Sequence, residues 1–157
     1  IQTNWLEQMV SMAIQKRIGA VGVKLLYPDD TIQHAGVIIG LGGVAGHAFT
    51  GIHKDEPGYF NYIQSTNNFS ALTAACLMLR TEVYDAVDGM DEQFEVEYND
   101  VDLCLKVREK GYFNVYLPHV ELYHFESFFH FELLVLFLLF YHILFHLFYN
   151  SMILLKF

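Results

Sequence analysis

Carboxylate side chains are concentrated in one short segment of this 157-residue chain. Nine of its 18 Asp and Glu residues fall between Glu82 and Asp102, and that segment contains no Lys or Arg. A solvated acidic face is a sufficient explanation for most of them. Asp100 and Asp102 differ, because they stand where a loop is expected to lead into a helix, beside apolar Val101 and Leu103. Such a carboxylate is either a helix cap or a general base that takes a proton from a hydroxyl group.

A second candidate for chemistry is His124, at the expected end of a strand. A lone histidine is usually structural, but imidazole binds a divalent metal well where carboxylates supply the other ligands. The residues themselves do not place His124 and Asp100 in one site.

The elements that must position these residues are predicted from periodicity and capping. A helix over 5–14 has apolar residues at helical spacing, with Asn4 as its N-cap and Gly19 beyond its end. The runs 20–27 and 32–40 predict a hairpin, and the Gly-rich segment 41–58 a long mobile loop. Further along we expect a buried strand at 69–79, short helices from Thr81 and Asn99, and two short strands at 114–118 and 120–124. This alternation predicts an α/β domain with a mixed sheet.

Charge and cysteine usage limit the classes of partner. The net charge is −9 with no basic run, which argues against a nucleic-acid partner. Cys76 and Cys104 lie in apolar runs without metal-ligand spacing and are expected to be buried thiols. Residues 1–18 are amphipathic and do not resemble a signal peptide. We therefore expect a cytoplasmic protein.

The composition changes after residue 127. Residues 133–155 contain no Asp, Glu, Lys or Arg over 23 positions, a length that suits a membrane-spanning helix. Three interpretations of this tail, 128–157, stay open: a spanning or membrane-lying helix at the inner face of a membrane, a buried helix docked on another part of the protein, and a non-native extension. We expect the tail to govern solubility and to contribute nothing to the chemistry.

Three segments resemble family 2 glycosyltransferases, and most closely bacterial enzymes of surface-polysaccharide synthesis such as rhamnosyltransferases. They are GAVGVKLLYPDDTIQHAGV (19–37), LTAACLMLRTEVYDAVDGMDEQFEVEYNDVDLCLKVREKGY (72–112) and VYLPHVELYHFES (115–127). The resemblance covers 1–127 and implies the C-terminal, acceptor-side part of a GT-A-like nucleotide-diphospho-sugar transferase fold.

The resemblance implies roles for individual residues. Asn99-Asp100 matches the family's Glu-Asp or Asn-Asp motif, so Asp100 would be the base that deprotonates the acceptor in an inverting displacement. Asp102 would orient the acceptor or the helix, and His124 would lie near the diphosphate and its metal, Mn²⁺ or Mg²⁺. The remaining matches are supporting positions: the acidic pair Asp91-Glu92, and Glu126 in the family's His-x-Glu-Ser ending.

The chain also departs from the family pattern. Asp88 and Phe125 replace a Gly and a His of its motifs, and no Asp-x-Asp precedes Trp5. The other acidic pairs, 29–30 and 55–56, look like solvated turns. We therefore expect the βαβ units that bind the nucleotide to be missing, and the nucleotide-binding residues stay unknown.

Two functions follow from these observations. The first is a fragment of an inverting glycosyltransferase that moves a sugar from a nucleotide-diphosphate donor to a glycan or lipid-linked acceptor, inactive as this chain alone. The second is a non-catalytic, membrane-attached module that binds glycan or a partner enzyme.

Overall fold

The computed structural model describes residues 3–94, 98–125 and 152–155. Within this part the helices are α1 (Trp5–Ala13), α2 (Thr81–Asp85) and α3 (Asn99–Glu109), with 3-10 turns at Tyr59–Asn61 and Ala74–Cys76. The strands are β1 (Ile18–Leu26), β2 (Ile32–His34), β3 (Val37–Ile39), β4 (Ala45–His47), β5 (Asn67–Phe69), β6 (Leu77–Arg80), β7 (Phe113–Tyr123) and β8 (Met152–Leu155).

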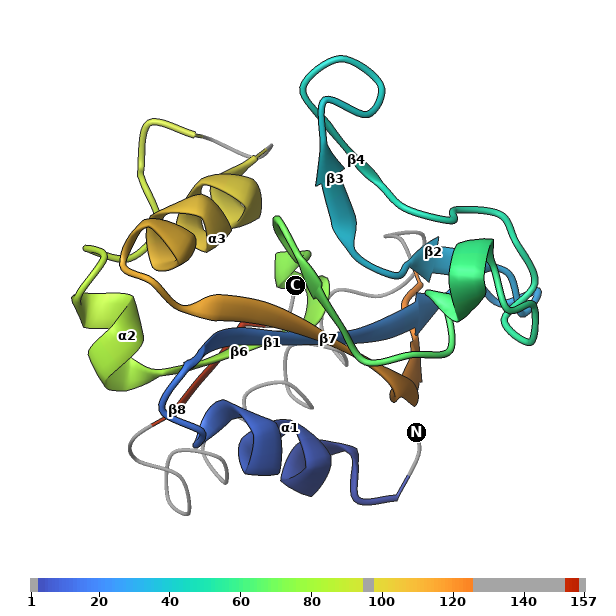
Figure 1. The fold of residues 1–157 in the computed structure, drawn as a ribbon, viewed down its shortest axis with the longest axis horizontal. Helices are drawn as coiled ribbons and strands as arrows, with labels where there is room; N and C mark the ends of the chain where they lie inside the picture. Colours follow the sequence, from blue (N-terminus) through green and yellow to red (C-terminus); the bar gives the residue numbers. More distant parts are fainter. Residues whose placement is uncertain (1–2, 95–97, 126–151, 156–157) are drawn as a thin grey trace.

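The main sheet is mixed, as the sequence predicts. Its described strands follow the order β5-β7-β1-β6-β8, and β2 pairs with the end of β1. β1 is parallel to β7, from Ile18 opposite Phe113 to Leu26 opposite Tyr123, and antiparallel to β6. β3 and β4 form a separate hairpin that projects from one side of the sheet (Figure 1).

β1 forms the centre of the molecule, and all nine of its residues are buried. Its side chains alternate between two cores, as the period of a strand requires. Val21 and Val23 face the core that contains Trp5 and Met9 of α1. Ala20 belongs to the opposite core, together with residues of α2 and α3. Figure 1 accordingly shows α1 on one side of the sheet and both other helices on the other.

Several predicted elements are confirmed. α1 lies within the predicted range, and α3 begins at Asn99 and is followed by Gly111, whose φ of 88° suits a helix end. Both cysteines are buried thiols. Burial raises the pKa of Cys104 to about 12, which keeps this thiol protonated.

Other predictions need correction at the level of single elements. Gly19 lies inside β1, and Asn4 precedes α1 without a side-chain capping bond. The strands expected at 114–118 and 120–124 are one strand, β7. The predicted break is a bulge, because Leu117 pairs with Val23 and Glu121 pairs with Lys24. Pro118 within this bulge explains the misleading break signal.

The segments 41–58 and 69–79 also differ from the prediction. Part of the first pairs as β4 with β3, so it is not a loop throughout. Within the second, Ala74–Cys76 form a 3-10 turn, and the strand β6 begins only at Leu77. The Thr73 hydroxyl accepts from Ala75 N–H at 3.3 Å and stabilises this turn.

The helix predicted over 133–155 is wrong for the residues of this stretch that the structure describes. Met152–Leu155 form β8, which pairs antiparallel with β6, from Leu77 opposite Leu155 to Arg80 opposite Met152. The unpaired edge of β6 offers backbone groups to an apolar strand, and Met152 is buried at 2% exposure. Residues 126–151 lie outside the described residues. No helix in the described ranges is long and apolar enough to cross a membrane.

Candidate functional site

The carboxyl ends of the parallel strands β1 and β7 open onto a cavity of about 340 Å³. Ends of parallel strands are common ligand sites in α/β proteins, because the loops that follow the strands diverge there. The cavity is lined by Tyr27, Gln33, His47, Thr50, Thr73, Ala75 and His124.

His124 is held at this cavity by Gln33 of β2. The backbone N–H of His124 donates to the Leu26 carbonyl at 3.0 Å, which fixes the chain just after β7. The Gln33 amide nitrogen donates to the His124 carbonyl at 3.4 Å, and its Oε1 lies 2.8 Å from His124 Nδ1. Because Oε1 can only accept, Nδ1 carries a proton and donates to it.

Two further histidines lie beside Gln33. His47 Nδ1 donates to the Gln33 carbonyl at 3.1 Å, and its ring meets that of His34 edge-on at 4.9 Å. His34 is fully buried, and its Nε2 accepts from the N–H groups of Gly36 and Thr73. Burial, with a smaller contribution from His47, holds the pKa of His34 well below its usual range. His34 is therefore a neutral support beneath the cavity.

Asp100 is joined to the same cavity through the turn at 73–76. Its Oδ2 accepts from Ala74 N–H at 2.9 Å, and its Oδ1 accepts from Val101 N–H at 2.8 Å. Thr73 and Ala75, on either side of Ala74, line the cavity with His124. The fold thus brings the start of α3 and the end of β7 to one short turn, which the sequence does not reveal.

The other residues expected to support the site have separate contacts. Asp102 forms an ion pair with Lys106 at 2.7 Å along α3, a contact that raises the pKa of Lys106. Asn99 donates to the Phe94 carbonyl at 2.6 Å, and Asp91 accepts from Gln93 N–H at 2.9 Å. These bonds order the loop before α3. Glu92 is exposed, and Glu126 lies outside the described residues.

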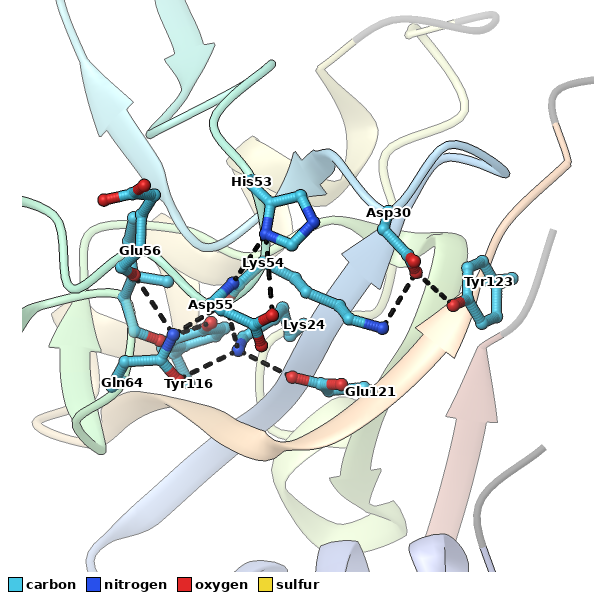
Figure 2. A network of polar contacts seen from close by, with 11 residues as sticks. Lys24, Asp30, His53, Lys54, Asp55, Glu56, Gln64, Tyr116, Glu121 and Tyr123 are labelled. Carbon is cyan, nitrogen blue, oxygen red and sulfur yellow. Dashed lines mark hydrogen bonds and ion pairs between the residues drawn. The ribbon is translucent and has the colours of Figure 1, made fainter.

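A polar network next to the cavity ties the loop 53–64 to the sheet (Figure 2). The buried Lys24 ammonium of β1 donates to the Lys54 carbonyl, to Gln64 Oε1 and, at 2.8 Å, to Glu121 of β7. The Lys54 side chain pairs with Asp30 at 2.8 Å, and Asp30 also accepts from the Tyr123 hydroxyl.

This network corrects the expectation of a solvated turn for Asp30, whereas Asp29 is exposed as predicted. The hydrogen bond from Lys54 is the main cause that lowers the pKa of Asp30, with that from Tyr123 second. Since Tyr123 directly precedes His124, the network also fixes the approach of the chain to the cavity.

A resident metal is only partly supported by these residues. The imidazole of His124 suits a divalent ion. Within residues 3–94, 98–125 and 152–155, however, no group of three or more His, Cys, Asp or Glu is arranged to hold one. The described residues thus supply a single candidate ligand and no complete site.

The sequence analysis missed Gln33 and Thr73, which shape the cavity. A signal for Gln33 was available, because Gln33-His34 is a polar pair inside the otherwise apolar run 32–40. Thr73 carries no comparable signal, since its role depends on a turn within a segment that reads as a strand.

Comparison with known proteins connects the chain to polysaccharide synthesis. It is 52% identical over 128 residues to the uncharacterized protein y4gI of Sinorhizobium fredii, a match that covers 81% of this chain and 14% of that protein. It is 39% identical over 128 residues to the O-antigen biosynthesis protein RfbC of Myxococcus xanthus, covering 81% of this chain and 10% of RfbC.

A shorter match adds a named transferase. Over 53 residues the chain is 34% identical to an N-acetylglucosaminyl-diphospho-decaprenol L-rhamnosyltransferase of Mycobacterium tuberculosis, covering 34% of this chain and 17% of that enzyme. The chain therefore spans less than a fifth of the length of each of these relatives. No protein-family model and no solved structure matches it. The two functional names support a glycosyltransferase-like family with a role in polysaccharide synthesis.

Proposed function

We propose that this chain is the acceptor-side part of an inverting family 2 glycosyltransferase with a GT-A-like fold. The observation that carries the proposal is the Asp100 carboxylate at the turn that lines the His124 cavity. The names of the relatives, O-antigen biosynthesis protein and L-rhamnosyltransferase, support a sugar-transfer reaction. The donor would be a nucleotide-diphosphate sugar, and the acceptor a glycan or a lipid-linked saccharide.

In this mechanism Asp100 is the general base. It takes the proton of the acceptor hydroxyl, whose oxygen attacks the anomeric carbon while the bond to the donor diphosphate breaks on the opposite face. Each carboxylate oxygen of Asp100 already accepts one backbone N–H, and these bonds orient it. Each oxygen has a second lone pair, so the carboxylate is both fixed and able to accept a proton.

Other residues would bind and orient the reactants. Gln33 orients the ring of His124 through its contact with Nδ1, and His124 would then supply an imidazole ligand to Mn²⁺ or Mg²⁺. The divalent ion would neutralise charge on the leaving diphosphate, and its other ligands would have to come from outside the described residues. The loop 53–64, fixed by Lys24, would contribute to acceptor choice.

The test is an Asp100→Asn substitution in a protein that joins this chain to a nucleotide-binding half. Asn keeps an oxygen that can accept from Ala74 N–H, so the fold should persist. Sugar transfer should fall by about 10²-fold or more, the usual contribution of a positioned general base, with little change in donor KM.

Glu109→Gln is the matched control. Its carboxylate is exposed at the far end of α3 from Asp100, so its loss should leave turnover within a few-fold of the original protein. Equal turnover of Asp100→Asn and the unchanged protein would remove Asp100 from the mechanism. The 157-residue chain by itself should show no transfer with any nucleotide sugar.

A further inference from the structure

A second cavity, of about 330 Å³, lies at the opposite end of β7 from His124. Phe113 and Asn114, the first residues of β7, line it together with Asn68, Ser70, Arg108 and Tyr112. β7 separates the two cavities, because it runs beside β1 from Ile18 to Leu26, a length of about 26 Å at roughly 3.3 Å per residue. The second cavity is therefore distinct from the proposed site of transfer.

The polar groups of this cavity are available to a ligand. Lys24, Lys54, Arg80 and Lys106 each pair with a carboxylate, whereas the exposed Arg108 guanidinium has no hydrogen bond or ion pair to any described residue. The side chains of Asn68 and Ser70 likewise have no hydrogen-bond partner within the described ranges. Together they offer a guanidinium, an amide and a hydroxyl.

The lining of this cavity includes a buried hydrogen-bond acceptor, on Asn114, that has no donor among the described residues. Asn114 is 1% exposed, and its amide nitrogen donates to the Ser70 carbonyl at 3.0 Å and to the Cys104 carbonyl at 2.9 Å. Its Oδ1 has no hydrogen-bond partner among the described residues. Because buried polar atoms are normally satisfied, this oxygen lacks a donor, such as a hydroxyl group or a water molecule, that the described residues do not supply.

Arg108 is the charged residue that lines the cavity, in a chain whose net charge is −9. No Asp or Glu lines it. The next residues along the chain, Glu109 and Lys110, are exposed and carry opposite charges. A guanidinium without a carboxylate in the same lining attracts anions.

We propose that this cavity binds an acidic saccharide. Arg108 pairs with its carboxylate in the two-point geometry that guanidinium favours, and Asn68 and Ser70 hydrogen-bond its hydroxyl groups. The proposal does not depend on the sugar-transfer reaction, since it uses none of the residues around His124 or Asp100.

The test is isothermal titration of the 157-residue chain with D-glucuronate, D-glucose and inorganic phosphate. Glucuronate should bind saturably, and at least about tenfold more tightly than either glucose, which lacks the charge, or phosphate, which lacks the sugar hydroxyls. Arg108→Gln should weaken glucuronate binding by about tenfold or more, and Arg108→Lys by less, because lysine keeps the charge but not the two-point geometry.

Lys16→Gln is the control, since it removes one exposed charge from the neighbouring 15–17 segment and should change binding by less than about twofold. Equal losses of glucuronate affinity in Arg108→Gln and Lys16→Gln would indicate general attraction of anions and would overturn the proposal. Binding of glucose or phosphate as tight as that of glucuronate would also overturn it. So would the absence of any glucuronate binding. Asp100→Asn should bind glucuronate normally, so failure here is distinct from failure of the proposed transferase function.

Discussion

Lys24 is an uncommon residue, a fully buried ammonium in the central strand. A buried charge is tolerated only when it is paired and hydrogen-bonded, and Lys24 has three acceptors, two of them on the loop 53–64. The ammonium thus holds the loop and the end of β7 in one arrangement.

Replacing Lys24 with Met should lower the free energy of unfolding by about 2–3 kcal/mol, the cost of breaking hydrogen bonds to a charged group in the interior. Amide exchange of residues 53–64 should accelerate at the same time. Chemical denaturation and hydrogen exchange measure the two effects. Lys54→Met is the matched control, because the Lys54–Asp30 pair is partly exposed and its loss should cost clearly less stability. If both substitutions cost the same, the buried position of Lys24 has no special role.

His34 makes stability depend on pH. Its pKa is depressed in the folded state, so the unfolded chain binds a proton more readily, near pH 6.5. The contribution of His34 to the free energy of unfolding is fully present above that pH. It is lost as the pH falls from 6.5 toward the pKa of the folded state, by at most about 1.4 kcal/mol per pH unit.

His34→Gln should remove this part of the pH dependence while keeping an oxygen that accepts from Gly36 and Thr73. The measurement is the free energy of unfolding at pH 7.5 and 5.5. The difference between the two values should shrink by about 1.4 kcal/mol in the variant. The exposed His119→Gln should leave the difference unchanged. An identical pH dependence in His34→Gln and the unchanged chain would show that His34 does not titrate on unfolding.

At the scale of elements, the contact between α3 and β1 depends on Gly19. A Cβ added there would lie 2.2 Å from Val107 Cγ1 and 2.7 Å from Tyr112 Cβ. Because these atoms belong to well-packed segments, the helix would have to move away from the strand. The same helix carries Asp100, so the packing of α3 on β1 affects the candidate site.

Gly19→Ala should therefore destabilise the fold by about 2–3 kcal/mol through overpacking. Gly22→Ala in the same strand is the control, because its Cβ would lie 3.2 Å from the Leu72 side chain, and it should cost less than about 1 kcal/mol. Thermal and chemical denaturation compare the two. A Gly22 variant as damaged as the Gly19 variant would contradict this account of the α3 contact.

At the scale of the whole molecule, β8 joins the distant end of the chain to the central sheet. Its pairing covers the outer edge of β6, and Met152 fills part of the core beneath α1. Met152–Leu155, the described part of the tail, are therefore a strand of the sheet and not part of a helix.

A chain that ends at Ser151 should lose about 2 kcal/mol of stability from the burial of Met152 alone. Its amides at Leu77–Arg80 should exchange faster, and the exposed β6 edge should promote aggregation. Hydrogen exchange and size-exclusion chromatography measure these effects. A chain that ends at Leu155 keeps β8 and should behave like the full chain. Unchanged exchange of Leu77–Arg80 after the shorter truncation would mean that β8 does not protect β6.

The sequence by itself determined the features that depend on neighbouring residues. The start of α3 at Asn99, the helix end at Gly111 and the burial of both cysteines follow from capping, backbone preference and apolar neighbours. The glycosyltransferase-like resemblance could also be read from local motifs, because it rests on residue types at fixed spacing.

Only the tertiary structure decided which distant residues meet. The contacts of the site join residues that are 26 to 97 positions apart. They are the hydrogen bonds of Asp100 with Ala74, of Gln33 with His124, and of Lys24 with its acceptors. Sequence spacing carries no information about such contacts, since they arise from strand order and register. The break predicted between residues 118 and 120 was wrong, and so was the helix for Met152–Leu155, for the same physical reason. Hydrogen bonding to β1 and to the edge of β6 overrides the local preferences of those segments.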